Sequence, residues 1–369
     1  MTTMPPRPAP GGYLPTLDGW RAIAIVGVMV AHGGDPLFTS GGPLAHEWLY
    51  ALTRYGAKGV DVFFGISGFL ICSRLIEEIG ARGRIDLVGF YIRRFFRILP
   101  PCFAYLITVL VLAGAGLLTV TGGELWSSAL FVRNYYPVDG AAGWYTGHLW
   151  SLAIEEHFYL IWPSLLALWG IRRARWGVVV MSLAIGLWRL LEFRLQLGTQ
   201  VIAGVGFYGR TDIRLDALLW GAWFALVVAR PHWRAFLTRH VTGPVWTATC
   251  FALLACLVGQ PPLALVWQSV LIPVLIVGTV LRPTSRLSLV LELAPLRWIG
   301  RLSYSLYLWQ QLFLVGAAVA EPPPFGLSQT FPLNVVFVFA LSAVSYYVVE
   351  RPMIRLGHRL AAPVTEGRR

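Results

Sequence analysis

Long apolar stretches dominate this sequence. Ten of them approach the roughly 20 residues that a helix needs to cross the hydrocarbon core of a bilayer. Of all residues, 56% are hydrophobic and 13% are charged, whereas a soluble domain carries about 25% charged residues. We therefore expect an all-α, polytopic transmembrane helical bundle of about ten spans. The expected spans are 17–37, 56–78, 98–119, 149–169, 175–193, 212–229, 243–259, 263–281, 300–320 and 332–350.

Arginines are unevenly distributed between these stretches. The formal net charge is +12. With a cytoplasmic N-terminus, the inner loops hold Arg74, Arg82, Arg84, Arg93, Arg94, Arg97, Arg172, Arg173, Arg175, Arg230, Arg234, Arg239, Arg282, Arg286, Arg297 and Arg301. The outer loops hold only Arg54, Arg133, Arg194 and Arg210. The positive-inside rule then predicts both termini in the cytoplasm of a multi-pass cell-membrane protein. Arginines that bind nucleic acid would gather on one soluble surface, so we expect no such partner.

The ends of the chain differ from its middle. Residues 1–16 contain a proline-rich head and predict a disordered tail, while residues 17–352 form the membrane domain and residues 353–369 a cytoplasmic tail. The four cysteines lie in or beside apolar stretches and have no metal-ligand spacing with histidines. They are interpreted as small buried hydrophobic residues, and no metal site is expected. The sequence does not indicate an oligomeric state.

Ionisable residues within a span are costly and are functional candidates for that reason. The first span carries Asp18, Arg21 and His32. Arg21 and His32 are eleven residues apart, which is three helical turns and about 16 Å along one helix face. An imidazole can serve as a general base near neutral pH, although a lone histidine in a helix is more often a packed residue.

A second group lies in the fourth span, at residues 148–163. Ser151, Glu155 and Tyr159 repeat every four residues and share one helix face, whereas Glu156 and His157 point elsewhere. Glu155 is expected to orient an imidazole or to take up a proton. The alternative is a structural hydrogen bond to another span.

Further charges allow two interpretations each. Arg93, Arg94 and Arg97 precede the third span and either contact lipid phosphates or clamp the phosphates of a cytoplasmic donor, with Arg94 and Arg97 on one face. Asp61 lies in the second span, and Arg210, Asp212, Arg214 and Asp216 lie at the head of the sixth. Internal ion pairs would satisfy these last charges without any chemistry.

Seven segments together resemble the acyltransferase-3 family of membrane acyltransferases. They are LDGWRAIAIVGVMVAH (17–32), GVDVFFGISGFLI (59–71), FYIRRFFRILP (90–100), HLWSLAIEEHFYLIWP (148–163), RLDALLWG (214–221), GRLSYSLYLW (300–309) and ERP (350–352). They follow the family order over nearly the whole chain. The resemblance is to the stand-alone form, without an appended esterase-like domain.

The resemblance implies transfer of an acyl group, usually acetyl, from cytoplasmic acyl-CoA to a hydroxyl. By position it implies that Arg21 and His32 form the arginine–histidine signature, and that Arg94 and Arg97 are the paired inner arginines. The remaining matched positions are Asp61, His148, Glu155, Arg214 and Asp216. Two positions depart from the family pattern: Gln310 replaces a usual histidine, and His157 replaces a usual glutamine.

We therefore expect a membrane O-acyltransferase in which His32 acts as general base or as transient acyl carrier. Arg93, Arg94, Arg97 and Arg21 would hold the phosphates of acyl-CoA, a co-substrate rather than a permanently bound cofactor. The acceptor would be a hydroxyl of a sugar, a surface glycan or a small metabolite. Two other functions stay open, a proton-coupled transporter and a non-catalytic membrane assembly subunit.

Overall fold

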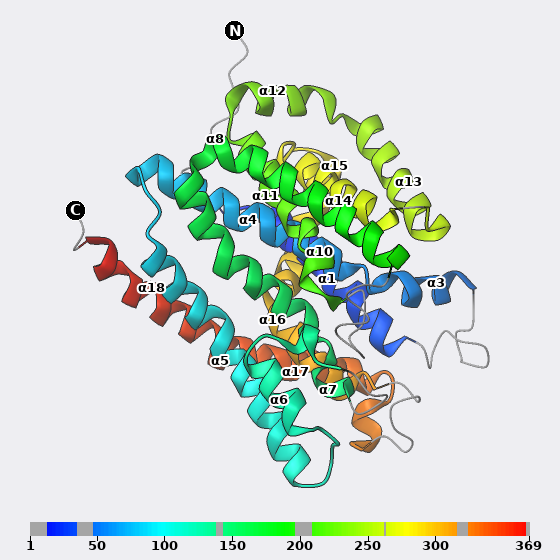
Figure 1. The fold of residues 1–369 in the computed structure, drawn as a ribbon. Coiled ribbons are helices and arrows are strands. Elements are labelled where there is room, and N and C mark those ends of the chain that lie inside the picture. Colours follow the sequence, from blue (N-terminus) through cyan, green and yellow to red (C-terminus); the bar gives the residue numbers. More distant parts are fainter. Residues whose placement is uncertain are drawn as a thin grey trace.

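Helices form all the regular structure that the computed structural model describes, in residues 13–34, 47–137, 143–195, 209–261, 263–315 and 324–366. The predicted all-α class is confirmed (Figure 1). The longer helices are α1 (Pro15–Gly33), α4 (Gly59–Arg82), α5 (Leu87–Gly114), α8 (Leu149–Leu195), α11 (Asp216–Val228), α13 (Gly243–Gly259), α14 (Ala264–Val280), α16 (Ala294–Phe313), α17 (Leu333–Ser345) and α18 (Arg351–Glu366). Shorter helices are α3 (Glu47–Gly56), α6 (Gly122–Ala129), α7 (Trp144–Gly147), α10 (Thr211–Arg214), α12 (Pro231–His240) and α15 (Arg286–Leu291).

Where the structure describes them, the predicted spans fall largely on these helices. The spans 149–169 and 175–193 share α8, which breaks at Gly170 with a φ of 67° that favours glycine. The span 332–350 continues through a π-helical turn at Tyr346–Glu350 into α18, so most of the predicted C-terminal tail is helix. Helix α1 begins at Pro15, inside the predicted N-terminal tail, and residues 1–12 lie outside the described ranges.

The length and apolarity of the described helices identify fewer membrane spans than the ten that the sequence predicts. Among the described residues, three helices are long and apolar enough to cross a bilayer: Tyr50–Arg82, Leu87–Gly114 and Leu333–Ala362. A fourth would be the pair α12 and α13, which is bent by 79°. Helices α11 and α14 are apolar but shorter. Ten spans with both termini inside therefore remain a prediction.

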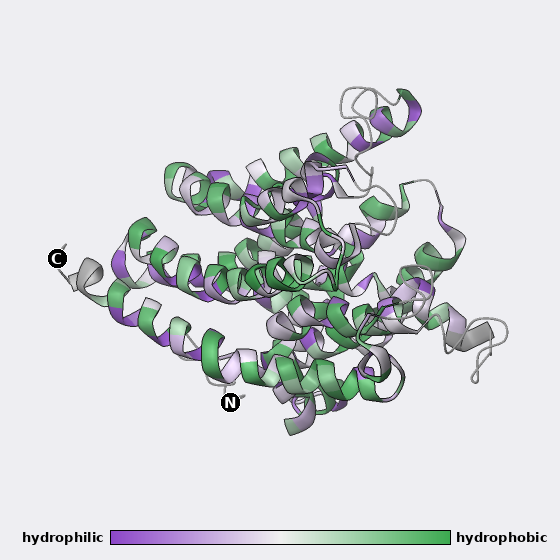
Figure 2. Cartoon of the chain, turned by 90° about the horizontal axis from the view of Figure 1, so that it is seen from below, coloured by the Kyte–Doolittle hydropathy of each residue, from purple (hydrophilic) through white to green (hydrophobic). Residues whose placement is uncertain are grey.

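The outer face of α5 is apolar. Ile107, Leu110 and Val111 are 59%, 54% and 63% exposed, and Phe103 lies on the same face one turn earlier. Tyr105 on the opposite face is fully buried. Figure 2 shows that hydrophobic residues predominate along many of the helices. An apolar stripe of this length on an exposed helix face suits contact with lipid chains rather than water.

Glycines allow two pairs of helices to approach closely. A Cβ atom at Gly68 of α4 would collide with the backbone oxygen of Leu218 on α11, and one at Gly300 of α16 would collide with that of Asp18 on α1. Small residues at such crossings bring backbones together in membrane bundles. Helix α18 lies along α5 (Figure 1). These pairs form the frame around the cavity described next.

Candidate active site

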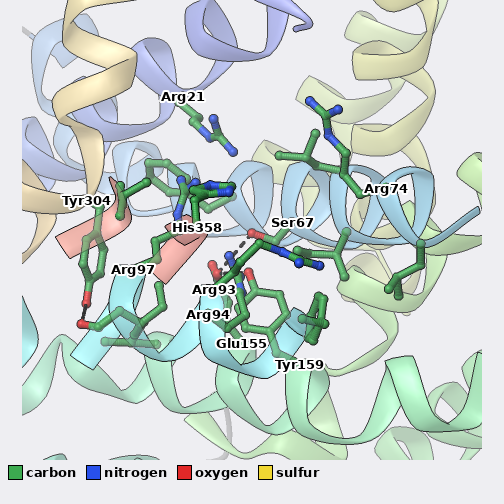
Figure 3. Close-up of a pocket in the computed structure, with 18 of the residues that line it drawn as sticks. Arg21, Ser67, Arg74, Arg93, Arg94, Arg97, Glu155, Tyr159, Tyr304 and His358 are labelled. Atoms are coloured by element: carbon green, nitrogen blue, oxygen red, sulfur yellow. Dashed lines mark hydrogen bonds between the residues drawn. The ribbon is translucent and has the colours of Figure 1, made fainter. Parts of the chain in front are cut away.

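A cavity of about 780 Å³ lies between α1, α4, α5, α8, α16 and α18. Figure 3 shows charged and aromatic side chains from these helices around it. The polar lining includes Arg21, Ser67, Arg74, Arg93, Arg94, Arg97, Glu155, Tyr159, Tyr304 and His358. A smaller chamber of about 250 Å³ shares Arg21, Arg74 and Arg97 with it. The cavity therefore carries an excess of positive charge.

The arginines of α5 are positioned by the turn that precedes the helix. Helix α4 ends at Gly83, whose φ of 73° reverses the chain. Asp86 then caps α5 by accepting a hydrogen bond from the backbone N–H of Gly89, at 3.1 Å. Glu78 of α4 accepts from the Asp86 backbone N–H at 3.1 Å and lies 3.8 Å from the Arg93 guanidinium. The first two turns of α5 are thus fixed against α4.

Several cavity arginines have carboxylate partners. Arg21 pairs with Asp18 at 3.2 Å. Glu78 pairs with both Arg93 and Arg82, and the Arg82 guanidinium lies 3.5 Å from the Glu78 carboxylate. These charges are partly neutralised within the protein. Their capacity to bind an anionic ligand is lower for that reason.

Arg94 and Arg97 differ from the others. Within the described ranges neither forms a hydrogen bond or ion pair with a carboxylate. The Arg94 guanidinium stacks over the Tyr159 ring at 3.6 Å from its centroid, and its buried Nε has no partner there. Both side chains line the cavity, which confirms that they share one helix face. A half-buried guanidinium without a carboxylate is well suited to bind phosphate.

Glu155 lies in the same cavity. Its carboxylate accepts hydrogen bonds from the hydroxyls of Tyr159 at 2.5 Å and Ser67 at 3.0 Å. Ser151, one turn earlier, also lines the cavity, so the predicted shared face of Ser151, Glu155 and Tyr159 is confirmed. In the described part of the chain the Glu155 side chain forms no hydrogen bond with His32. Glu155 therefore lines the same cavity as Arg94 and Arg97.

His32 lies in a separate layer of polar and aromatic residues. Its Nδ1 is 3.3 Å from Oε1 of Gln310, and its ring meets the Trp144 ring edge-on, with centroids 5.6 Å apart. His148 packs between the rings of Tyr105 and Tyr307, at 5.4 and 5.2 Å. Both ring nitrogens of His148 are buried without a hydrogen-bond partner among the described residues. We call His32, Trp144, His148 and Gln310 the histidine layer.

Tyr307 connects this layer to the cavity. Its hydroxyl donates to the backbone oxygen of His148, and it lies 2.6 Å from the Ser151 hydroxyl. Because a carbonyl oxygen can only accept, Tyr307 is the donor there, and Ser151 can donate to Tyr307. Ser151 and Tyr307 both line the cavity. The cavity wall therefore borders directly on the histidine layer.

The remaining predicted candidates are ion-paired elsewhere. Arg214 of α10 pairs with Asp61 of α4, and Asp216 of α11 pairs with Arg189 of α8 at 2.5 Å. Arg210 bridges Glu192 at 2.6 Å and Asp212 at 2.5 Å. We call these residues the ion-pair cluster. It agrees with the interpretation of Asp61, Arg214 and Asp216 as internal ion pairs.

Sequence reasoning missed several residues. Ser67 and Tyr307 lie inside the quoted segments 59–71 and 300–309 but were not singled out. Arg189 and Glu192 are ionisable residues inside the predicted span 175–193, which is a usable signal. Across the described ranges no group of histidine, cysteine, aspartate or glutamate residues could hold a metal ion.

Comparison with known proteins adds an independent finding. A family model described as an acyltransferase domain matches residues 14–351. The peptidoglycan O-acetyltransferase OatA of Listeria monocytogenes is 28% identical over 372 residues, which cover 94% of this chain and 56% of that protein. The O-acetyltransferase OatA of Staphylococcus aureus is 28% identical over 380 residues, covering 95% and 58%. The chain spans little more than half the length of these curated relatives. No solved structure matches it.

Proposed function

We propose that this chain, which belongs to the acyltransferase-3 family, is a membrane O-acyltransferase that uses a cytoplasmic acyl-CoA. The observation that carries the proposal is the cavity in which Arg94 and Arg97 lie without carboxylate partners, and whose wall touches the histidine layer. Acetyl is the expected acyl group, because the relatives are named O-acetyltransferases. The family model supports the reaction class, while substrate and mechanism are our proposal.

The donor would bind by its phosphates. CoA is a polyanion, and Arg94 and Arg97 supply guanidinium groups in a partly desolvated cavity, where charge-assisted hydrogen bonds are strong. Arg21 and Arg93 would add weaker contacts, because carboxylates already hold them. The predicted topology opens this end of the cavity to the cytoplasm, where acyl-CoA is present.

The reaction would take place at the other end. Arg21 and His32 are separated by about 16 Å along α1, and the extended pantetheine arm of CoA would bridge the phosphates and the thioester. His32 takes the proton of the acceptor hydroxyl as the oxygen bonds to the thioester carbonyl carbon. The carbon–sulfur bond breaks, and the CoA thiolate receives a proton. Alternatively, the His32 imidazole attacks the thioester first, and CoA leaves as the thiol with the proton of the ring. The acyl-imidazole then passes the acyl group to the hydroxyl, whose proton returns to the ring.

Other residues would assist. Glu155, held by Ser67 and Tyr159, would orient the acceptor or the pantetheine arm inside the cavity. His148 lies beside Tyr307 and would contact the reacting groups through its unpartnered ring nitrogens. We propose a sugar hydroxyl of a surface glycan or a glycosylated metabolite as the acceptor.

The test uses the purified chain in lipid nanodiscs with radiolabelled acetyl-CoA and cell-wall glycan fragments or methyl glycosides as acceptors. We expect label in the glycan, and a loss of about 10²–10⁴-fold in rate for His32→Ala. His240→Ala, at the exposed C-terminal end of α12, is the matched control and should keep full activity. Full activity of His32→Ala would contradict the mechanism. CoA-independent solute flux with no acyl transfer would instead support a transporter.

A further inference from the structure

Gln310 occupies the position next to His32 with a defined orientation. The residue is completely buried. Its Nε2 lies 3.4 Å from the backbone oxygen of Tyr307, one turn earlier on α16, and its Oε1 lies 3.3 Å from Nδ1 of His32. A carbonyl oxygen only accepts, so the NH₂ group must face Tyr307. The amide oxygen is thereby left facing the imidazole.

We propose that Gln310 is a positioning residue that fixes the tautomer of His32. An amide oxygen accepts but cannot donate, so Nδ1 of His32 must carry the proton when the ring is neutral. Nε2 is then the unprotonated nitrogen, and among the described residues the His32 ring has a hydrogen bond only through Nδ1. Nε2 is therefore the atom that takes the proton of the acceptor hydroxyl or carries the acyl group. This last clause rests on the proposed function, whereas the tautomer does not.

The residue type explains why the orientation is unambiguous. A histidine at this position would not fix the tautomer in the same way. Two adjacent imidazoles could exchange donor and acceptor roles, because each neutral ring has one of each. A glutamine whose NH₂ is held by Tyr307 offers only its oxygen. Glutamine is thus a fixed acceptor, where a histidine would be a titratable partner.

Other titratable groups surround this end of α1. On or next to the elements packed against α1 and the histidine layer, they are His148 before α8, Tyr145 on α7, Tyr307 on α16, Tyr50, Arg54 and Tyr55 on α3, Lys58 in the turn between α3 and α4, and Asp61 on α4. None of them changes in a variant at position 310. A difference between such variants therefore reports the residue at position 310.

The decisive measurement is solid-state ¹⁵N NMR of the full chain with ¹⁵N-labelled histidine in lipid nanodiscs. The seven histidines include six others, so the His32 signals are found as those missing from His32→Gln. We expect a protonated Nδ1 and an unprotonated Nε2 near neutral pH. In Gln310→Met, which keeps the volume but removes the acceptor, both tautomers should be populated. An unprotonated Nδ1 in the unchanged protein, or no change in Gln310→Met, would overturn the proposal.

Kinetics then test the catalytic consequence. Gln310→Met should lower kcat for acetyl transfer about tenfold, the worth of one hydrogen bond, and leave KM for acetyl-CoA unchanged. Gln310→Glu keeps an acceptor oxygen and should recover the Nδ1-protonated tautomer in the spectrum. Gln268→Met is the matched control, because Gln268 on α14 is equally buried but its amide has no partner in the described ranges. A higher KM for acetyl-CoA with an unchanged kcat in Gln310→Met would contradict a positioning role. A correct tautomer in a protein without transferase activity would reject only the proposed function.

Discussion

Two regions of this molecule are rich in arginine, and they differ in whether a carboxylate contacts the arginine. In the ion-pair cluster, Arg189, Arg210 and Arg214 each contact a carboxylate, and each is at most 7% exposed. In the cavity, Arg94 and Arg97 are half-buried and face open volume. The Arg94 guanidinium stacks on the face of Tyr159 and has no hydrogen bond or ion pair with a carboxylate among the described residues.

The difference separates structural charge from functional charge. A buried ion is expensive unless it is paired, so the ion-pair cluster keeps its arginines and carboxylates together. An excess of positive charge along a cavity lowers the free energy of an anion that enters it. The first arrangement is complete without a ligand. We propose that a ligand completes the second, and that this ligand is acyl-CoA, bound through its phosphates.

The largest expected effect comes from breaking the ion-pair cluster. Arg214→Met leaves Asp61 as an uncompensated buried charge, and loss of one partner of such a pair costs about 3–5 kcal/mol. We expect a large fall in thermal stability, measured as the fraction of protein that stays monodisperse in size-exclusion chromatography after heating. The acetyl-transfer rate per folded molecule should be close to that of the unchanged protein.

A double variant distinguishes the pair from general damage. Asp61→Leu with Arg214→Met removes both charges, and replacing a buried pair by apolar residues is often close to neutral. The double variant should recover most of the stability that the single variant loses. If it is as unstable as Arg214→Met but binds CoA normally, charge pairing is not what holds this cluster. If CoA binding is lost in a stable double variant, the division between the two regions is wrong.

The next largest effect is expected from variants of the cavity arginines, as a loss of affinity for acetyl-CoA. Each of Arg94→Gln and Arg97→Gln removes charge-assisted contacts worth about 1.5–3 kcal/mol, and therefore raises the Kd for acetyl-CoA about ten- to a hundredfold. Thermal stability should change little, because neither guanidinium is held in a direct hydrogen bond or ion pair with a carboxylate among the described residues. Isothermal titration calorimetry of the protein in nanodiscs measures the Kd directly.

Arg172→Gln is the matched control for these variants. Arg172 is exposed on α8 and does not line the cavity. It belongs to the same set of predicted inner-loop arginines and contributes the same net charge. An equal loss of CoA affinity in Arg172→Gln would mean that overall charge, rather than the two cavity arginines, attracts the donor.

Local patterns in the sequence predicted the parts of the site that lie on one helix. The spacing of Arg94 and Arg97, and that of Ser151, Glu155 and Tyr159, placed each group on one face, and each group lines the cavity. Helical periodicity suffices for such relations because neighbours three or four residues apart share a face.

Relations between helices could not be predicted in this way. Gln310 meets His32 across 278 positions, and only the packing of α1 against α16 brings them together. Glu155 was expected to orient an imidazole or to take up a proton, and its hydrogen-bond partners Ser67 and Tyr159 could not be read from the spacing alone. The span count differs for a related reason. Helices that bury polar side chains against each other, such as α1 and α16, need not be uniformly apolar to lie in a membrane.

The smallest effect tests how the cavity arginines are held. Asp86→Ala removes the N-cap of α5, which costs about 1 kcal/mol, and it leaves the guanidinium groups of Arg94 and Arg97 in place. Differential scanning fluorimetry should show a small drop in melting temperature, and Kd for acetyl-CoA should rise no more than a few-fold. Asp86→Asn can still accept the Gly89 hydrogen bond and should behave like the unchanged protein. A loss of CoA binding in Asp86→Ala as large as that in Arg94→Gln would contradict this division. It would place the binding energy in the rigidity of the α4–α5 turn rather than in the two unpaired charges, because the capping residue itself has no part in binding phosphate.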